Sequence, residues 1–229
     1  MMLPEPPLTR LRWRQHFRII PSTYPPVNFF ERLVDPEQMD ALWYIESLTN
    51  DRLREEAGDI ALVAPEDRVC GPGSTPIMAA FTHIGRPTRF TDGSYGVYYA
   101  SKTLETALRE TVFQKEQFLA ATGQGPCDVD MRVYIGRVVQ PLHDLRDDIY
   151  ADLHHSSEYT QSQTFARHYR DQGSWGFVYN SVRHSGGENI AVFRPPALTP
   201  PSQGKHLAYS WDGSRIATVY EKSEPLLTF

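Results

Sequence analysis

The chain has 229 residues, of which 40% are hydrophobic and 22% charged, a balance typical of one globular domain with a buried core. Its net charge of −5 gives no overall positive field for nucleic acid. Its two cysteines form neither a disulfide framework nor a metal-binding spacing. Because no signal peptide or membrane-length apolar run is visible, we expect a cytoplasmic protein with no direct contact to nucleic acid or membrane.

The first third of the chain predicts an arm followed by mixed elements. Residues 1–16 are Pro-rich and then basic, and we expect them to form an N-terminal arm before one domain at 17–229. Apolar patterning and Pro36 at a first helical position then predict, in order, a strand over 17–22, a helix over 35–50, strand or loop over 58–76, and a short helical turn over 77–83.

The stretch "TRFTDGSYGVYYASKTLETALRETV" (88–112) predicts a strand over 96–101 and a helix over 102–122. Thr103 is suited to cap that helix. The expected apolar stripe consists of Leu104, Ala107, Leu108, Thr111 and Val112.

The remaining pattern predicts strands around one further helix. The expected elements are a strand from 131 to Pro141, a helix over 156–173, a hairpin of 176–183 with 189–195, and a hairpin within 206–220 that turns at Asp212 and Gly213. Strands recur without strict βαβ alternation. The predicted class is therefore α+β, one domain with mixed or antiparallel sheets flanked by helices.

Three side chains in 88–112 are not explained by packing alone. Arg89 precedes a Gly-containing turn and has the planar, permanently charged fork that suits phosphate. Tyr98 and Tyr99 must point to opposite sheet faces, and the pattern alone does not select one. Glu110 falls on the flank of the apolar stripe near Ala107. From there it can point across the strand–helix seam.

These residues resemble the signature of the RES-domain family. That signature has an arginine in RF or RW, then GV-x-Y-x-A, then an acidic residue ending TAL-x-E. The chain carries a looser arginine motif at 88–91, followed by the matching segments at 96–100 and 106–110. The family serine in G-x-x-Y-x-S-x-R matches Ser181 of "GFVYNSVRHSGGENIAVF". "FRIIPS" resembles the family's N-terminal aromatic–Arg strand and points to Arg18.

The resemblance implies a fold similar to ADP-ribosyltransferases and a toxin of a toxin–antitoxin pair that destroys NAD. It implies NAD as substrate and phosphate or water as the acceptor of the ribosyl group. No metal is expected, because the histidines are scattered and have no metal-ligand spacing with carboxylates. The resemblance also implies an Xre-type helix-turn-helix antitoxin as partner and a toxin homodimer. The alternative is a mono-ADP-ribosyltransferase that modifies a specific protein, and the sequence does not separate these acceptors.

The resemblance assigns the site residues. The catalytic set is Arg89, Tyr99, Glu110 and Ser181, and the NAD-binding set is Arg18, Arg89, Tyr99 and Arg183. Glu110 is expected to stabilise a ribosyl cation, Arg89 with Arg18 to hold the pyrophosphate, and Ser181 to donate a hydrogen bond. Arg183, two residues after Ser181, is the candidate for a second anion site if phosphate is the acceptor, and it shares the face of Ser181 only if the strand is regular. His184 can line the same pocket or lie in a solvent-exposed loop. An RNA-cleaving toxin using Glu110, Arg89 and His184, or a non-catalytic binding module, are the rivals from other classes.

Overall fold

The computed structural model describes residues 3–22 and 58–223. The helix expected over 35–50 lies outside these residues. No helix in the described part of the chain is long and apolar enough to cross a membrane.

The described residues build one mixed nine-stranded sheet in the order β1-β5-β6-β7-β3-β2-β4-β8-β9. Only β5 and β6 pair in parallel among the described strands, and every other pair is antiparallel. The strands are β1 (Leu8–Thr9), β2 (His16–Pro21), β3 (Tyr98–Ser101), β4 (Cys127–Gly136), β5 (Leu142–Asp144), β6 (Gly176–Asn180), β7 (Glu188–Val192), β8 (Ser202–Trp211) and β9 (Ile216–Lys222). The predicted α+β domain with a mixed sheet is confirmed.

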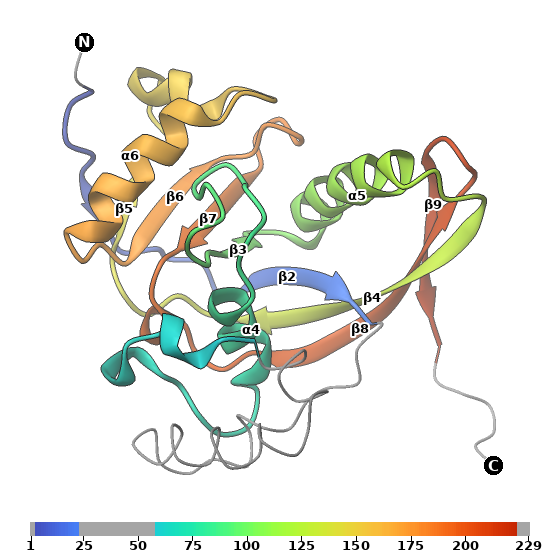
Figure 1. The fold of residues 1–229 in the computed structure, drawn as a ribbon, viewed down its shortest axis with the longest axis horizontal. Helices are drawn as coiled ribbons and strands as arrows, with labels where there is room; N and C mark the ends of the chain where they lie inside the picture. Colours follow the sequence, from blue (N-terminus) through green and yellow to red (C-terminus); the bar gives the residue numbers. More distant parts are fainter. Residues whose placement is uncertain (1–2, 23–57, 224–229) are drawn as a thin grey trace.

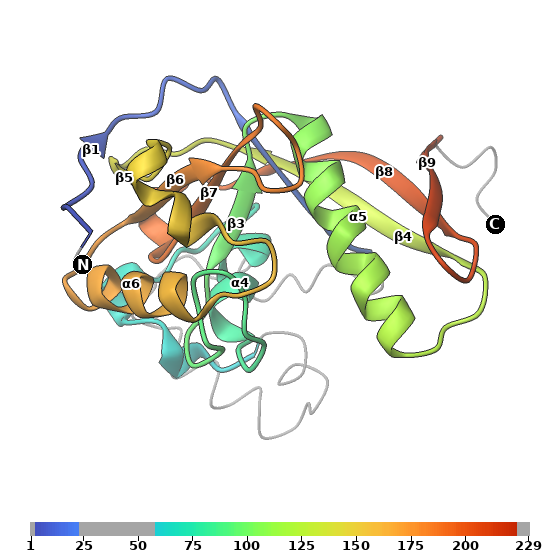
Figure 2. The same cartoon turned by 90° about the horizontal axis from the view of Figure 1, so that it is seen from above.

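Helices cover both faces of the sheet. They are α4 (Thr75–Thr82), α5 (Leu104–Ala121) and α6 (Thr160–Asp171), with short 3-10 helices at Ile60–Leu62, Pro65–Asp67, Asp148–His154 and Pro195–Ala197. Figures 1 and 2 show α5 and α6 over one face and α4 on the other. Helix α6 packs on β6 and β7, whereas α5 packs on β2 and β4. The sheet face between α5 and α6 therefore lies at a seam between two core clusters.

Strand alternation decides which side chains reach that seam. In β3, Tyr98 packs in the core beneath α4, whereas Tyr99 packs in the core beneath α6. In β7, Ile190 and Ala191 separate in the same way. The expected opposite placement of the two tyrosines is confirmed, and Tyr99 is the one that shares a face with α5 and α6.

Local chemistry explains why α5 begins where it does. Thr103 accepts a hydrogen bond from the backbone N–H of Thr106 at 3.2 Å, which confirms the predicted cap. The predicted stripe packs against β2, β4 and β8 through Leu104, Ala107, Leu108 and Val112. Thr111 instead bonds the hydroxyl of Tyr209 at 2.7 Å.

Several boundaries differ from the prediction. The region 58–76, expected as strand or loop, is loop with two short 3-10 helices, and helix α4 already begins in it at Thr75. Helix α6 begins at Thr160, four residues late. The delay has a physical reason, because Glu158 accepts the backbone N–H of Thr160 at 2.9 Å and thereby holds a turn. The strand expected up to Pro141 ends at Gly136, and a second short strand follows the proline.

The N-terminal arm is part of the packed structure. Leu8 and Thr9 pair with β5 at the sheet edge, and Leu11 and Trp13 pack on the core beneath α4. Strand β2 starts at His16, so it begins within the expected arm.

Candidate active site

Glu110 is the centre of a hydrogen-bonded cluster at the seam between α5 and the β6–β7 turn. Its Oε1 accepts a hydrogen bond from Ser181 Oγ at 2.6 Å and a second from Asn189 Nδ2 at 2.7 Å. Its Oε2 accepts no hydrogen bond from the described residues. Two donors on one oxygen fix the plane of the carboxylate and leave the other oxygen available to a ligand.

The turn after β6 holds Ser181 with its proton aimed at Glu110. Ser181 Oγ accepts the backbone N–H of Arg183 at 3.2 Å and that of His184 at 3.0 Å. A hydroxyl accepts two hydrogen bonds and donates one, so Ser181 is fully used here. Its geometry is that of a residue that positions Glu110.

The Gly-Gly turn lets this segment approach α5 closely. A Cβ at Gly187 would come within 2.8 Å of the side chain of Thr106, so a larger residue would push the turn away from the helix. His184 adds a second link, because its Nδ1 lies 2.9 Å from Thr106 Oγ1. His184 thus joins the turn to α5.

Asn189 is a site residue that the sequence analysis did not single out. It is 2% exposed, and its Oδ1 accepts a hydrogen bond from Ser101 Oγ at 2.7 Å. That bond fixes the amide so that Nδ2 points to Glu110. An asparagine inside the apolar run "NIAVF" was the available signal, since a buried amide needs partners.

Arg89 is presented by a loop that α6 anchors. Ser162 Oγ donates to the carbonyl of Arg89 at 2.6 Å. The guanidinium Nη1 donates to the carbonyls of Leu153 at 3.0 Å and His155 at 2.8 Å, and the group lies 4.9 Å from the Tyr159 ring centre. Nη2 and Nε donate no hydrogen bond within the described chain, which leaves donors for an anion.

Tyr99 supports the same loop. Its hydroxyl lies 2.7 Å from Thr88 Oγ1 and accepts the backbone N–H of Phe90 at 3.0 Å, so it is hydrogen-bonded to the residues on both sides of Arg89. Burial raises the pKa of Tyr99, which keeps the hydroxyl protonated.

Tyr179 is a second residue that the sequence analysis did not select, although it occupies the tyrosine position of the quoted serine motif. Burial, followed by the nearby charge of Glu110, raises the pKa of Tyr179 well above its ordinary value. Tyr99 raises that pKa further, whereas Arg89 lowers it. The ring of Tyr179 also packs against Phe90, the residue next to Arg89, with the ring centres 4.9 Å apart.

Arg18 lies away from this cluster. Its guanidinium packs 4.4 Å from the centre of the Tyr98 ring, on the α4 side of the sheet, and donates from Nη1 to the carbonyl of Tyr99 at 2.9 Å. Burial lowers the pKa of Arg18. The structure thus joins Arg18 to Tyr99 through the backbone only.

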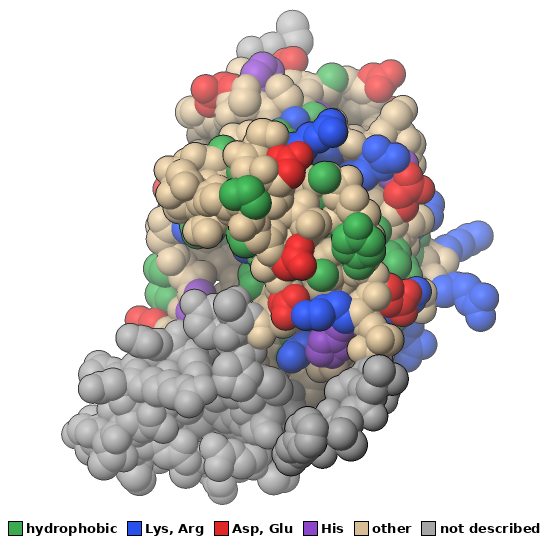
Figure 3. Space-filling model, turned by 90° about the vertical axis from the view of Figure 1, so that its right-hand side faces the viewer, with side chains coloured by type: hydrophobic (Ala, Val, Ile, Leu, Met, Phe, Trp, Pro, Cys, Tyr) green, Lys and Arg blue, Asp and Glu red, His purple; other side chains and the backbone are tan. Residues whose placement is uncertain are grey.

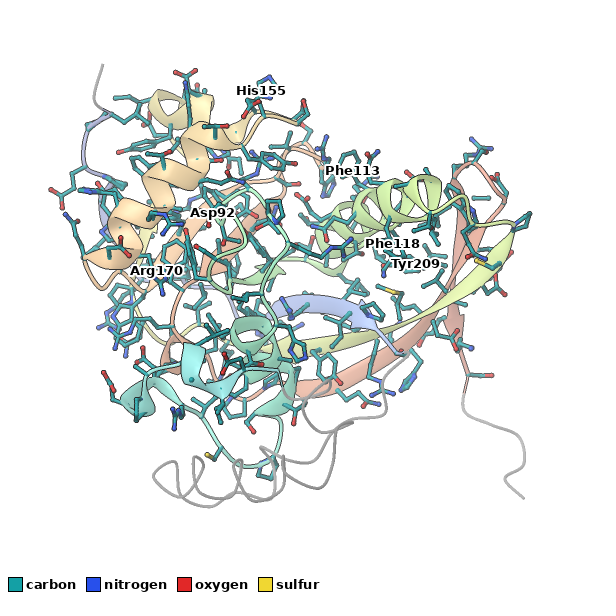
Figure 4. All side chains as sticks on the ribbon, viewed as in Figure 1. Asp92, Phe113, Phe118, His155, Arg170 and Tyr209 are labelled. Carbon is teal, nitrogen blue, oxygen red and sulfur yellow. The ribbon has the colours of Figure 1, made fainter. Side chains whose placement is uncertain are left out.

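Arg183 connects α5 to the turn before α6. Strand β6 ends at Asn180, so Ser181 and Arg183 both lie in the turn after the strand. Its guanidinium lies 3.5 Å from the centre of the Phe113 ring on α5 and donates to the carbonyl of Ser156 in the turn before α6. Figure 4 labels Phe113 and His155 on the two sides that Arg183 connects.

No group of three or more His, Cys, Asp or Glu side chains with metal-binding geometry occurs among residues 3–22 and 58–223. One pocket, of about 720 Å³, lies beside the N-terminal arm. Another, of about 460 Å³, lies near Tyr95 and Arg194. Neither is lined by Glu110. The candidate site is therefore defined by its hydrogen-bond geometry.

Comparisons of the sequence and the structure with known proteins give the following matches. Residues 65–212 match the model of the RES domain. The Sinorhizobium fredii (strain NBRC 101917 / NGR234) protein y4oC is 30% identical over 207 residues, which cover 90% of this chain and 86% of that protein. A chain of the M. tuberculosis MbcT–MbcA toxin–antitoxin complex is similar over 59% of this chain and 72% of its own, with 9% identity and a TM-score of 0.38.

Proposed function

Because this chain belongs to the RES domain family, we propose that it is the toxin of a toxin–antitoxin pair and depletes NAD by cleaving the nicotinamide–ribose bond. The observation that supports this most is the carboxylate of Glu110, which Ser181 and Asn189 hold by one oxygen while the other stays free. All the residues of this cluster lie within the matched RES region.

The proposed reaction breaks the bond between ribose C1′ and the nicotinamide nitrogen. The bonding electron pair leaves with nicotinamide, which becomes neutral, and positive charge develops on the ribosyl ring. A fixed carboxylate stabilises that charge, and the cost of orienting it is met before the substrate arrives. The free oxygen of Glu110 is the group that supplies this stabilisation. An oxygen of phosphate or water then bonds to C1′; attacking water loses a proton to solvent.

The arginines are proposed to hold the pyrophosphate. Arg89 has two nitrogen atoms without described partners, and its loop is fixed by Tyr99 and Ser162. Arg183 lies beside Ser181 and is proposed as the second cation. Arg18, whose guanidinium packs on the ring of Tyr98 and donates to the backbone carbonyl of Tyr99, is proposed to act by supporting β3 from the opposite face.

The partner and the assembly are proposed from the family resemblance. We propose an Xre-type helix-turn-helix antitoxin, a toxin homodimer within the complex, and action in the cytoplasm. The acceptor is either phosphate, which gives an ADP-ribose phosphate, or water, which gives ADP-ribose.

The deciding experiment is to incubate the purified protein with NAD, with and without inorganic phosphate, and to identify the products by mass. We expect nicotinamide release in every case, with a phosphorylated ADP-ribose product if phosphate is the acceptor. Labelled protein in place of free ADP-ribose would identify the ADP-ribosyltransferase alternative. Intact NAD together with cleaved transcripts in expressing cells would contradict the proposal in favour of an RNA-cleaving toxin.

A further inference from the structure

The N-terminal arm separates apolar from basic side chains. Leu11 and Trp13 pack on the core beneath α4, whereas Arg10, Arg12 and Arg14 are exposed. None of these three arginines forms an ion pair with the described residues. Alternate residues of the arm therefore anchor it to the core and present three arginines that no carboxylate of the described residues neutralises.

The arm forms one wall of the pocket of about 720 Å³. Residues 9–15 line it together with Phe17, residues 102–104 and Arg146. The two cations on the other walls are already neutralised by two carboxylates, because Lys102 and Arg146 pair with Glu188 and Arg146 also pairs with Asp144. The excess positive charge of this pocket therefore comes from the three arm arginines.

This surface contrasts with the protein as a whole, whose net charge is −5. On the face seen in Figure 3, acidic and basic side chains are interspersed. We propose that the arm pocket is a docking site for an acidic segment of a protein partner, with carboxylates on Arg10, Arg12 and Arg14 and an apolar side chain against Trp13 and Phe17.

Charge complementarity favours a protein segment over a nucleic acid. Three arginines neutralise few phosphates, and a net negative protein repels the rest of a long polyanion. A short acidic segment presents a few carboxylates, which arginine binds with its planar fork. The aromatic walls give such a segment an apolar contact as well.

The docking site is separate from the candidate active site. Glu188 and Asn189 are neighbours in β7, so their side chains point to opposite sheet faces. Glu188 bonds the two pocket cations, whereas Asn189 bonds Glu110. Glu110 does not line the arm pocket, and this inference does not depend on the proposed NAD chemistry.

The test measures binding of a fluorescent short peptide of glutamates with two leucines, by anisotropy at low salt. The variant R12E/R14E should bind about tenfold more weakly than the parent protein, because attraction becomes repulsion. The matched control R137E/R215E changes the same charge at two exposed arginines outside the pocket and should bind nearly as the parent does. Circular dichroism and thermal unfolding establish that both variants are folded.

Three outcomes overturn the proposal. The first is no binding by the parent protein beyond that of the same peptide with glutamines in place of glutamates. The second is an equal loss of binding in the two double variants. The third is tighter binding of a single-stranded DNA of equal charge with the same dependence on Arg12 and Arg14, which would assign the pocket to nucleic acid. NAD cleavage measured on R12E/R14E should be unchanged whichever peptide result is found.

Discussion

Strand β3 carries a tyrosine beside an arginine on each of its faces, and the two pairs differ in kind. On the α4 side, Tyr98 lies under Arg18, and its hydroxyl lies 3.0 Å from the Nε2 atom of His16. On the other side, Tyr99 is hydrogen-bonded to the loop that carries Arg89. Burial raises the pKa of both tyrosines, to about 12 for Tyr98.

The comparison shows that a shifted pKa does not by itself locate a site. His16 has its pKa lowered to about 3 by burial, and the Nε of Arg18 has no hydrogen-bond partner, yet no carboxylate of the described residues bonds either side chain. The Arg89 side also holds tyrosines whose pKa is raised by burial, Tyr99 and Tyr179, but it offers in addition free donors on Arg89 and the free oxygen of Glu110. What distinguishes the candidate site is unused bonding capacity that faces a seam between elements.

The largest effect is expected at Glu110. The substitution E110Q keeps the size of the side chain and removes the charge, so NAD cleavage should fall by about 10³-fold, the scale of a lost preorganised electrostatic contact. The control E105Q lies on the same helix, where Glu105 is exposed and pairs with Arg109, and should retain activity. Nicotinamide release measures both. A fully active, folded E110Q would remove Glu110 from the mechanism.

A smaller effect should separate the two tyrosines. Y98F removes the hydroxyl beside His16 and leaves a buried ring nitrogen without that partner, so the free energy of unfolding should fall by about 1–3 kcal/mol with kcat/KM little changed. Y99F loosens the Arg89 loop, so kcat/KM should fall by about tenfold. Urea unfolding and NAD kinetics on the pair measure the two effects. A loss of kcat/KM in Y98F together with a loss of stability alone in Y99F would contradict the placement of the active site on the Tyr99 face.

The smallest effect is the pH dependence of stability that His16 confers. Its folded pKa of about 3 lies below the ordinary value of 6.5, so the unfolded chain binds the proton first as the pH falls. The contribution of His16 to the free energy of unfolding should therefore be fully present above about pH 6.5. Below that pH it should decline, by up to about 1.4 kcal/mol per pH unit. Urea unfolding between pH 7.5 and 5 should show a flatter slope for H16Q than for a control, H168Q, at an exposed histidine. Equal slopes would contradict a neutral, buried His16.

Local patterns were sufficient to predict α5 with its cap at Thr103, the β6–β7 hairpin, and the opposite placement of Tyr98 and Tyr99. Each depends on residues close together in the chain. The role of Asn189 was not predictable in this way, because its partners Ser101 and Glu110 lie 88 and 79 residues away. The face of the sheet on which Arg18 lies also depends on long-range strand pairing.

The position of Glu110 at the seam affects the order in which activity and secondary structure are lost on unfolding. Helix α5 belongs to the core cluster of β2, β4 and β8, whereas Ser181 and Asn189 belong to the β6–β7 half. A slight separation of the halves would leave each sheet segment intact and still break both hydrogen bonds to the carboxylate. When the protein is mildly destabilised, the proposed NAD cleavage should therefore be lost before secondary structure is lost. The rate of NAD cleavage is then the most sensitive measure of whether the two halves are in contact.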